Sequence, residues 1–386
     1  IGLVMLIGLV AKNGILIVEF ANQLRDAGME FVAAIQQASA QRLRPIVMTA
    51  FTTAMSSIPL IVASGPGSES RMVIGMVIFA GVSLATVSRV MNNNARVSEN
   101  TRNKVLAAME QLGYRPNSIA QSLASNRSNS VGILVSELHG PFYGEMLSGI
   151  ENECRAAGKH VIIAAGHSEE ASEKDGIEFL ISRSCDALIL HVEAVSDDYL
   201  IKLASGTLPI VLINRFIPRL ANNCISLNNE LGGYLATKQL LQQGHRQLAY
   251  MAGPMWKSDA KDRYHGHLRA MAEHSLSFNP ALLAEGDFQD SSGSACMQQL
   301  LAKGLPFTAL VCANDEMAAG AMEVARTHGL NVPQDLSIVG FDNLILARYI
   351  YPKLTTIDYP IGEMGRMAAR WVLKNIYQQP ALQLKN

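Results

Sequence analysis

The chain has 386 residues, a net charge of −1, 17% charged residues and 49% hydrophobic residues. This length leaves room for two or three domains with a large core. The five cysteines lie in the last two thirds of the sequence and form no CxxC pair, which predicts buried, reduced thiols and argues against a disulfide framework or a zinc site.

The charges are distributed unevenly. Residues 1–88 contain nine charged residues and three apolar runs: 1–18 with one charge, and 45–68 and 72–88 with none. A membrane-spanning helix needs about 20 predominantly apolar residues, so two runs are long enough and the third is slightly short. Arginines in the first link place it in the cytoplasm. We therefore predict a transmembrane helical fragment over residues 1–81, with three buried helices of a soluble protein as the alternative.

Three stretches of this fragment are distinctive: IGLVAKNGILIVEFAN (7–22), RLRPIVMTAFTTAMSSIPL (42–60) and SGPGSESRMVIGMVIFAG (64–81). They resemble the last three transmembrane helices of resistance–nodulation–division (RND) efflux transporters. The resemblance implies that Lys12 is the intramembrane lysine of a proton relay. The partner aspartates of that family lie on an earlier helix, which this sequence does not contain. We therefore expect a non-functional transporter remnant that associates with the membrane through residues 1–88.

The next segment, 82–128, has local positive charge. Residues 89–127 contain six basic and two acidic side chains, a balance of +4 that attracts phosphates. A turn at residues 80–83 precedes a predicted helix over 84–92, with Val87 and Val90 facing inward. A second predicted helix covers 101–112, after a cap at 97–99, and a third covers 118–124.

The order of these helices, AGVSLATVSRVMNN…VSENTRNKVLAAMEQLGYRPNSIAQSLAS, resembles the helix-turn-helix headpiece and hinge helix of lactose-repressor (LacI) family regulators. The resemblance implies base contacts in the major groove from Leu84, Ala85 and Arg89. It also implies a minor-groove wedge at Leu123 and phosphate contacts from four polar residues, Ser83, Thr86, Ser88 and Asn92. The sequence departs from the family where residues 70–79, an apolar stretch, replace the first headpiece helix.

From residue 129 onward, apolar strand-like runs alternate with amphipathic helices. This alternation predicts an α/β fold with parallel sheets covered on both faces. Two such sheets joined by cross-overs would leave a cleft at the carboxyl ends of their strands. Polar and aromatic residues follow the apolar runs, at 142–143, 214–215, 314–315 and 341–343.

The phrases HGPFYGEM, VLINR, CANDEMAAGAM and VPQDLSIVGFDN resemble the LacI-family core, a two-lobed fold like that of periplasmic binding proteins, and are nearest to galactose-type repressors. The resemblance implies an effector-binding domain over 129–386 that ends before the family's last strand. Asn314 and Asp342 would bind sugar hydroxyls, Phe142 or Tyr143 would line the cleft, and Arg215 is a further candidate. His267 stands where the family usually places an aromatic ring that stacks on the ligand.

Simpler roles remain open for some of these residues. The pair His265 and His267 could bind a metal, but side chains at i and i+2 of a helix diverge by about 200°. Asp342 could cap a loop, and Asp259, Asp262 and Arg263 could form a surface ion pair or the rim of a pocket. No GxSxG motif, Walker loop or paired catalytic carboxylate is present, so the sequence predicts neither an enzyme nor a cofactor or metal site.

The sequence thus favours a sugar-responsive, DNA-binding transcriptional repressor that acts as a homodimer on operator DNA. Residues 89–386 would lie in the cytoplasm, tethered to the inner membrane by the N-terminal segment. The alternatives are a sugar-binding protein without DNA regulation and a component of a membrane efflux transporter. Residues 80–87 suit both resemblances, so we expect a chimera whose two parents were joined through this shared stretch.

Overall fold

The computed structural model describes residues 18–41, 48, 84–91, 97–111 and 127–378. The chain divides into two compact units, Ile1–Gln121 and Ser122–Asn386. The predicted boundaries after residues 81 and 128 differ from this division, because helices α4 and α5 group with the N-terminal residues.

In the first unit, α4 (Leu84–Met91) and α5 (Glu99–Gln111) pack through a small apolar cluster. Val87, Val90 and Val105 are buried in it, and Val97 and Met109 pack against them. The predicted inward positions of Val87 and Val90 are therefore confirmed. The Ser98 hydroxyl accepts a hydrogen bond from the Thr101 amide at 3.4 Å, which is the capping contact expected before α5.

Residues 18–26 and 31–41 are also helical. None of the helices in the described ranges is both long enough and apolar enough to cross a bilayer. Most residues of the predicted spanning runs 1–18, 45–68 and 72–88 lie outside the described residues. Lys12 also lies outside them.

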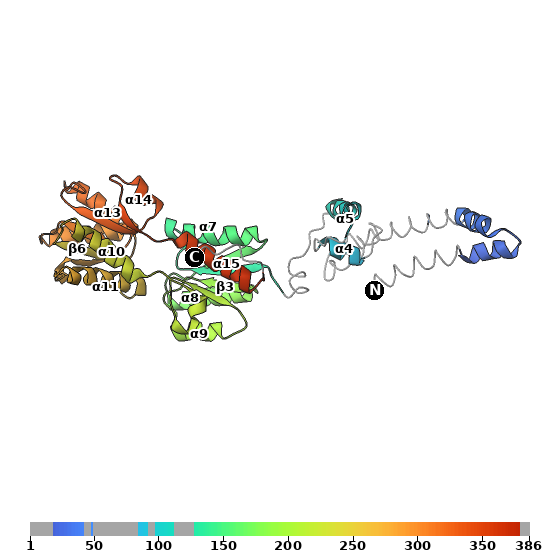
Figure 1. Ribbon diagram of the computed structural model, residues 1–386, viewed down its shortest axis with the longest axis horizontal. Coiled ribbons are helices and arrows are strands. Elements are labelled where there is room, and N and C mark those ends of the chain that lie inside the picture. Colours follow the sequence, from blue (N-terminus) through green and yellow to red (C-terminus); the bar gives the residue numbers. More distant parts are fainter. Residues whose placement is uncertain (1–17, 42–47, 49–83, 92–96, 112–126, 379–386) are drawn as a thin grey trace. The chain divides into compact units, whose positions relative to one another are not determined.

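The second unit contains two lobes, each built on a five-stranded parallel sheet (Figure 1). The first lobe has the strand order β2-β1-β3-β4-β5, and its strands are β1 (Ser130–Val135), β2 (His160–Ala165), β3 (Ala187–Leu190), β4 (Ile210–Ile213) and β5 (Cys224–Ile225). Its helices are α7 (Pro141–Ala156), α8 (Glu170–Ser182), α9 (Asp197–Ala204) and α15 (Ile361–Asn375), with a 3₁₀ turn at Pro218–Asn223.

The second lobe has the order β10-β9-β8-β6-β7. Its strands are β6 (Leu248–Ala252), β7 (Leu283–Glu285), β8 (Ala309–Cys312), β9 (Ser337–Asp342) and β10 (Thr355–Asp358). Its helices are α10 (Asn229–Gln242), α11 (Ser258–Glu273), α12 (Asp290–Ala302), α13 (Asp315–Thr327) and α14 (Ile345–Tyr349), with a 3₁₀ turn at Pro280–Leu282. Within residues 127–378 the chain crosses between the lobes twice, from β5 to α10 and from β10 to α15.

Each sheet is buried on both faces, which explains why its central strands are continuously apolar. In β3, Leu188 and Leu190 belong to one buried cluster and Ile189 belongs to the cluster on the opposite face. The predicted two-lobed α/β architecture is confirmed. Because all strands of a sheet are parallel, their carboxyl ends lie at one edge, and this edge positions the site.

Candidate functional site

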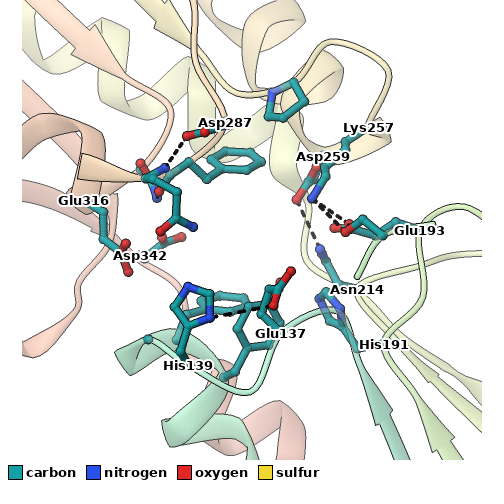
Figure 2. Close-up of a pocket in the computed structure, with 18 of the residues that line it drawn as sticks. Glu137, His139, His191, Glu193, Asn214, Lys257, Asp259, Asp287, Glu316 and Asp342 are labelled. Carbon is teal, nitrogen blue, oxygen red and sulfur yellow. Dashed lines mark hydrogen bonds and ion pairs between the residues drawn. The ribbon is translucent and has the colours of Figure 1, made fainter. Parts of the chain in front are cut away.

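A cavity of about 440 Å³ lies at the carboxyl ends of the strands, between the two lobes (Figure 2). Loops following β1 to β4 and β6 to β9 contribute to it. Four of the six predicted effector residues line the cavity: Phe142, Tyr143, Asn314 and Asp342. Parallel topology therefore gathers residues that are 200 positions apart in sequence.

Arg263 is the best-anchored polar group of the cavity and is 3% exposed. Its Nε donates to Asn229 Oδ1 at 2.9 Å and its Nη1 donates to the Ala313 carbonyl at 2.6 Å. The guanidinium carbon lies 3.8 Å from the Phe341 ring centroid. Two carboxylates approach it, Asp342 at 3.6 Å and Asp259 at 3.9 Å. Arg263 is thus rigid and desolvated, as a ligand-recognising guanidinium must be.

Asp342 ends β9 and is 6% exposed. Its Oδ1 has no hydrogen-bond partner among the described residues, although it lines the cavity. Burial raises the pKa of Asp342 well above its usual range, and the Arg263 guanidinium opposes that rise. A buried acceptor without a partner costs free energy, so this oxygen is available for a ligand hydroxyl.

A second buried carboxylate holds the loop that carries Asp342. Asp315 accepts hydrogen bonds from the Leu344 amide at 2.8 Å and from the Thr356 hydroxyl at 2.5 Å. Burial raises the pKa of Asp315 to about 6, although these hydrogen bonds lower it. Asp342 and Asn343 have φ of 109° and 56°, a backbone region that is strained for most residues. The Asp315 contacts stabilise this turn and so fix the direction of Asp342.

Aromatic rings form the wall contributed by the first lobe. Phe142 makes edge contacts with Tyr143 at 5.3 Å, His191 at 6.2 Å and Tyr359 at 5.2 Å between ring centroids. His191 is 3% exposed, and its Nε2 has no partner among the described residues. Burial lowers the pKa of His191, so the neutral ring is favoured at neutral pH.

Charged side chains link the two lobes beside the cavity. Lys257 Nζ lies 2.6 Å from Glu193 Oε2 and 3.3 Å from the Ser168 hydroxyl. The Asn214 amide donates to Asp259 Oδ2 at 3.3 Å. Figure 2 shows both links on the side of the cavity opposite Asp342 and Glu316. These contacts hold the lobes together in the present arrangement.

Asn314 faces the cavity but also caps a helix. Its Oδ1 accepts from the Met317 amide at 3.0 Å, and its Nδ2 donates to the Phe288 carbonyl at 2.8 Å. The amide is therefore fixed at the start of α13. One lone pair of its oxygen and one hydrogen of its nitrogen remain for a ligand.

Two predicted effector residues, Arg215 and His267, do not line this cavity. Arg215 directly follows Asn214, which lies just beyond β4 and has a φ of 60°. Asn214 faces the cavity, whereas Arg215 pairs with Asp197 at 2.6 Å. His267 lies one helical turn beyond Arg263, about 6 Å farther along α11. It is fully buried against Tyr250 and Phe278, with ring centroids 4.6 and 4.9 Å away.

The environment of His267 leads to a pH prediction. Burial lowers the pKa of His267 to about 3. The Thr237 hydroxyl donates to the Gly233 carbonyl and so accepts from His267 Nδ1, both at 2.9 Å. Below the unfolded pKa of about 6.5, only the unfolded chain binds this proton, so stability falls as the pH decreases. We expect this ring to account for about 2 kcal/mol of lost stability between pH 7 and pH 5.

Urea unfolding at both pH values checks this prediction. The variant His267→Phe should lose less stability on acidification than the wild type. His265→Phe is the matched control, because His265 lies exposed on the same helix. Equal pH dependence of the wild type and His267→Phe would contradict the assignment.

Sequence analysis missed several residues of the cavity and misplaced others. Asp259 and Arg263, interpreted as a surface ion pair or the rim of a pocket, are buried and line the cavity. One signal in the sequence could have indicated their place in the cavity. They are spaced i, i+4 at the start of a helix that follows an apolar strand. His191 and Lys257 also line the cavity. The loop-capping alternative for Asp342 is not supported, since its Oδ1 has no hydrogen-bond partner in the described part of the chain and lies 3.6 Å from Arg263 Nη1.

The predicted DNA-binding residues are only partly described. Arg89 is exposed on α4, on a helix that buries Val87 and Val90. Thr86 is half-buried, and Leu84, Ala85 and Ser88 also lie on α4. Ser83, Asn92 and Leu123 lie outside the described residues. The DNA contacts of all eight residues therefore remain predictions.

The described residues contain no group of three or more His, Cys, Asp and Glu side chains that could hold a metal. His265 is exposed and His267 is buried, so the two rings do not share a site. All five cysteines are free thiols, four of them buried and Cys224 half-buried.

Comparison with known proteins matches three family models to this chain. Residues 237–383 match the periplasmic binding protein-like domain, and residues 78–117 match bacterial regulatory proteins of the lacI family. Residues 1–90 match the AcrB/AcrD/AcrF family. The last two matches overlap at residues 78–90, which include residues 80–87, the stretch that suits both resemblances.

Two curated relatives and one solved structure cover most of the chain. The HTH-type transcriptional regulator GalR of Escherichia coli K12 is 40% identical over 307 residues, covering 80% of this chain and 90% of that protein. The HTH-type transcriptional repressor PurR of Aliivibrio salmonicida is 36% identical over 298 residues, covering 77% and 90%. The Lac repressor dimer bound to operator and the anti-inducer ONPF is 30% identical, with a TM-score of 0.72, covering 79% of this chain and 93% of that one.

Proposed function

Because the chain belongs to the LacI family of bacterial transcriptional regulators, we propose that it is a repressor that binds operator DNA and releases it when a small sugar occupies the cleft. The cleft carries this proposal: it combines a fixed guanidinium, a carboxylate oxygen without a hydrogen-bond partner among the described residues, and an aromatic wall. Such a set suits a ligand with vicinal hydroxyls and an apolar ring face. The Lac repressor structure, a dimer on its operator, supports a homodimer here as well.

The DNA-binding part of the proposal rests on α4. Its apolar side is buried against α5, and Arg89 is exposed. An exposed arginine on a recognition helix can bind guanine through two hydrogen bonds. We propose that Leu84, Ala85 and Arg89 contact bases and that Leu123 acts as a wedge, with phosphate contacts from Ser83, Thr86, Ser88 and Asn92.

The charge of the cavity restricts the effector. Six carboxylates line it, from Glu137, Glu193, Asp259, Asp287, Glu316 and Asp342, against the two cations Lys257 and Arg263. Both cations already pair with carboxylates. A phosphate or sugar acid would therefore meet repulsion, whereas hydroxyls can donate to the carboxylates. The effector that fits best is an uncharged sugar.

Isothermal titration of the full chain tests this assignment. A panel of neutral hexoses, including D-galactose and D-glucose, is compared with D-galactose 6-phosphate. We expect at least one neutral hexose to bind and the phosphorylated sugar to bind at least about tenfold more weakly, since like charges oppose its entry. Tighter binding of the phosphorylated sugar would overturn the proposed specificity.

For residues 1–81 we propose a non-functional remnant of an RND-type transporter. The sequence resemblance and the family-model match over residues 1–90 support this origin. In this proposal the chain is a chimera whose regulatory part acts in the cytoplasm and is tethered to the inner membrane through residues 1–88. Cell fractionation tests the tether: recovery of the full chain in the soluble fraction without detergent would contradict it.

A further inference from the structure

The segment that joins the core to the DNA-binding part enters the first lobe at Arg127, and one carboxylate holds the residues that follow. Asp186, just before β3, accepts from the Ser128 amide at 2.9 Å and the Ser128 hydroxyl at 3.2 Å through Oδ1. Its Oδ2 accepts from the Asn129 amide at 2.8 Å. Asn129 has a φ of 56°, so these bonds fix the backbone in the left-handed region.

Two side chains from other elements complete this contact. The Tyr377 hydroxyl donates to Asp186 Oδ2 at 2.7 Å. Lys159 Nζ donates to Asn129 Oδ1 at 2.6 Å and lies 4.0 Å from the centroid of the Tyr377 ring. Burial and the Asp186 carboxylate both raise the pKa of Tyr377, so its hydroxyl remains a donor. We call Lys159, Asp186 and Tyr377 the linker clamp.

Both helices that end at the linker clamp begin at the cleft. Helix α7 starts beside Phe142 and Tyr143, which line the cavity, and ends three residues before Lys159. Helix α15 starts two residues after Tyr359, whose ring contacts Phe142, and ends two residues before Tyr377. At 1.5 Å per residue each helix spans roughly 22–24 Å.

The two helices pack too closely to move independently. A Cβ added to Gly149 of α7 would overlap the Gly362 carbonyl of α15, and one added to Gly365 would overlap the Met146 carbonyl. Helix α15 also carries the return cross-over from the second lobe. A change in the angle between the lobes therefore displaces the ends of α7 and α15 that lie at the cleft. Because the two helices move together, the displacement reaches their other ends, which lie at the linker clamp.

We propose that the linker clamp is the element that couples occupancy of the cleft to the DNA-binding part, with Asp186 and Tyr377 as positioning residues that contact neither sugar nor DNA. This inference rests on the proposed function. Coupling between two sites is a free energy that can be lost while each site still binds its own ligand. Loss of coupling with both affinities unchanged distinguishes a residue that couples the two sites from one that only stabilises the fold.

The test measures three dissociation constants for the full chain. The first is the Kd for D-galactose, or for the hexose of the panel that binds most tightly. The other two are the Kd for a DNA duplex, selected from a random pool by the wild type, without sugar and with saturating sugar; the ratio of these two is the coupling ratio. The variants are Tyr377→Phe, which keeps the ring against Lys159, and Asp186→Asn. Tyr234→Phe is the matched control, since its hydroxyl donates to Glu273 at 2.7 Å, the same chemistry far from the linker in sequence.

We expect a wild-type coupling ratio within the usual range of about 5–150-fold. Tyr377→Phe should reduce that ratio at least about threefold and leave the sugar Kd and the sugar-free DNA Kd within roughly twofold of the wild type. Tyr234→Phe should leave all three constants unchanged. If Asp186→Asn does not fold, Tyr377→Phe alone decides the result.

The outcomes separate the clamp from the proposed function. An unchanged coupling ratio in Tyr377→Phe, or a parallel loss of sugar binding, overturns the clamp while the repressor function stands. A wild type that binds DNA without any response to sugar overturns the proposed function, and the clamp with it.

Discussion

Replacing Arg263 by methionine is expected to abolish sugar binding and to lower the free energy of unfolding by about 3 kcal/mol. The side chain is 3% exposed and lies within 4.0 Å of the carboxylates of Asp342 and Asp259. Without it, two buried carboxylates lose their nearest cation, and the Asn229 amide oxygen and the Ala313 carbonyl lose their donors. Titration calorimetry and urea unfolding of the full chain measure the two effects.

Two further variants separate the effect of losing the charge of Arg263 from the effect of losing its hydrogen-bond donors. Arg263→Lys keeps the charge but loses the fork of donors, so it should recover stability in part and sugar binding little. The double variant Arg263→Met/Asp342→Asn removes one orphaned carboxylate, so it should be more stable than Arg263→Met without regaining sugar affinity. Wild-type sugar affinity in Arg263→Met would show that the guanidinium is not part of the binding site.

The second large effect is expected at Gly266, where α11 crosses α10. A Cβ at this position would overlap the Glu230 carbonyl and the Tyr234 amide, and one at Gly233 would overlap the Arg263 carbonyl. Gly266→Val must therefore separate the two helices or bend one of them. We expect a loss of at least about 4 kcal/mol in unfolding free energy, in the range of severe overpacking. Displacement of α11 also moves Arg263, so sugar affinity should fall together with stability.

Gly144 provides the matched control for this prediction. It lies exposed in α7, and an added Cβ meets no atom within 4 Å. Gly144→Ala should be neutral or stabilise the chain by up to about 1 kcal/mol, since alanine favours the helix. Thermal unfolding of both variants gives the comparison. A Gly266→Val variant as stable as Gly144→Ala would contradict the close helix crossing.

Most strands of the core could be predicted from the sequence. The central strands are buried on both faces, so they appear in the sequence as continuous apolar segments. The apolar strand-like runs predicted from residue 129 onward correspond to β1, β2, β3, β4, β6, β8 and β9. Strands β5, β7 and β10 were missed. Each is an edge strand of two to four residues, and β10 has the polar sequence TTID. Such segments pair only because a neighbouring strand is already in place, which a local pattern does not reveal.

The site was predictable to the extent that topology alone determines it. Residues at or just beyond the carboxyl end of a buried strand, such as Asn314 and Asp342, were expected at the cleft and line it. Residues on helices were harder to assign to the site, because a shift of one turn along α11 decides whether a side chain reaches the cavity. Arg263 lines the cavity, whereas His267, one turn farther along, is buried outside it. Distinguishing the buried Arg263 from a surface ion pair also required its partners, Asn229 and Ala313, which lie far away in sequence.

The central claim is that sugar in the cleft weakens DNA binding, and fluorescence anisotropy measures this directly. A labelled duplex selected by the full chain is titrated with and without saturating D-galactose, or the hexose that binds most tightly, and Arg89→Ala serves as the DNA-contact control. We predict that sugar raises the DNA Kd at least about fivefold and that Arg89→Ala weakens DNA binding by about 1–3 kcal/mol without changing the sugar Kd. An identical DNA Kd with and without a sugar that demonstrably binds would contradict the account.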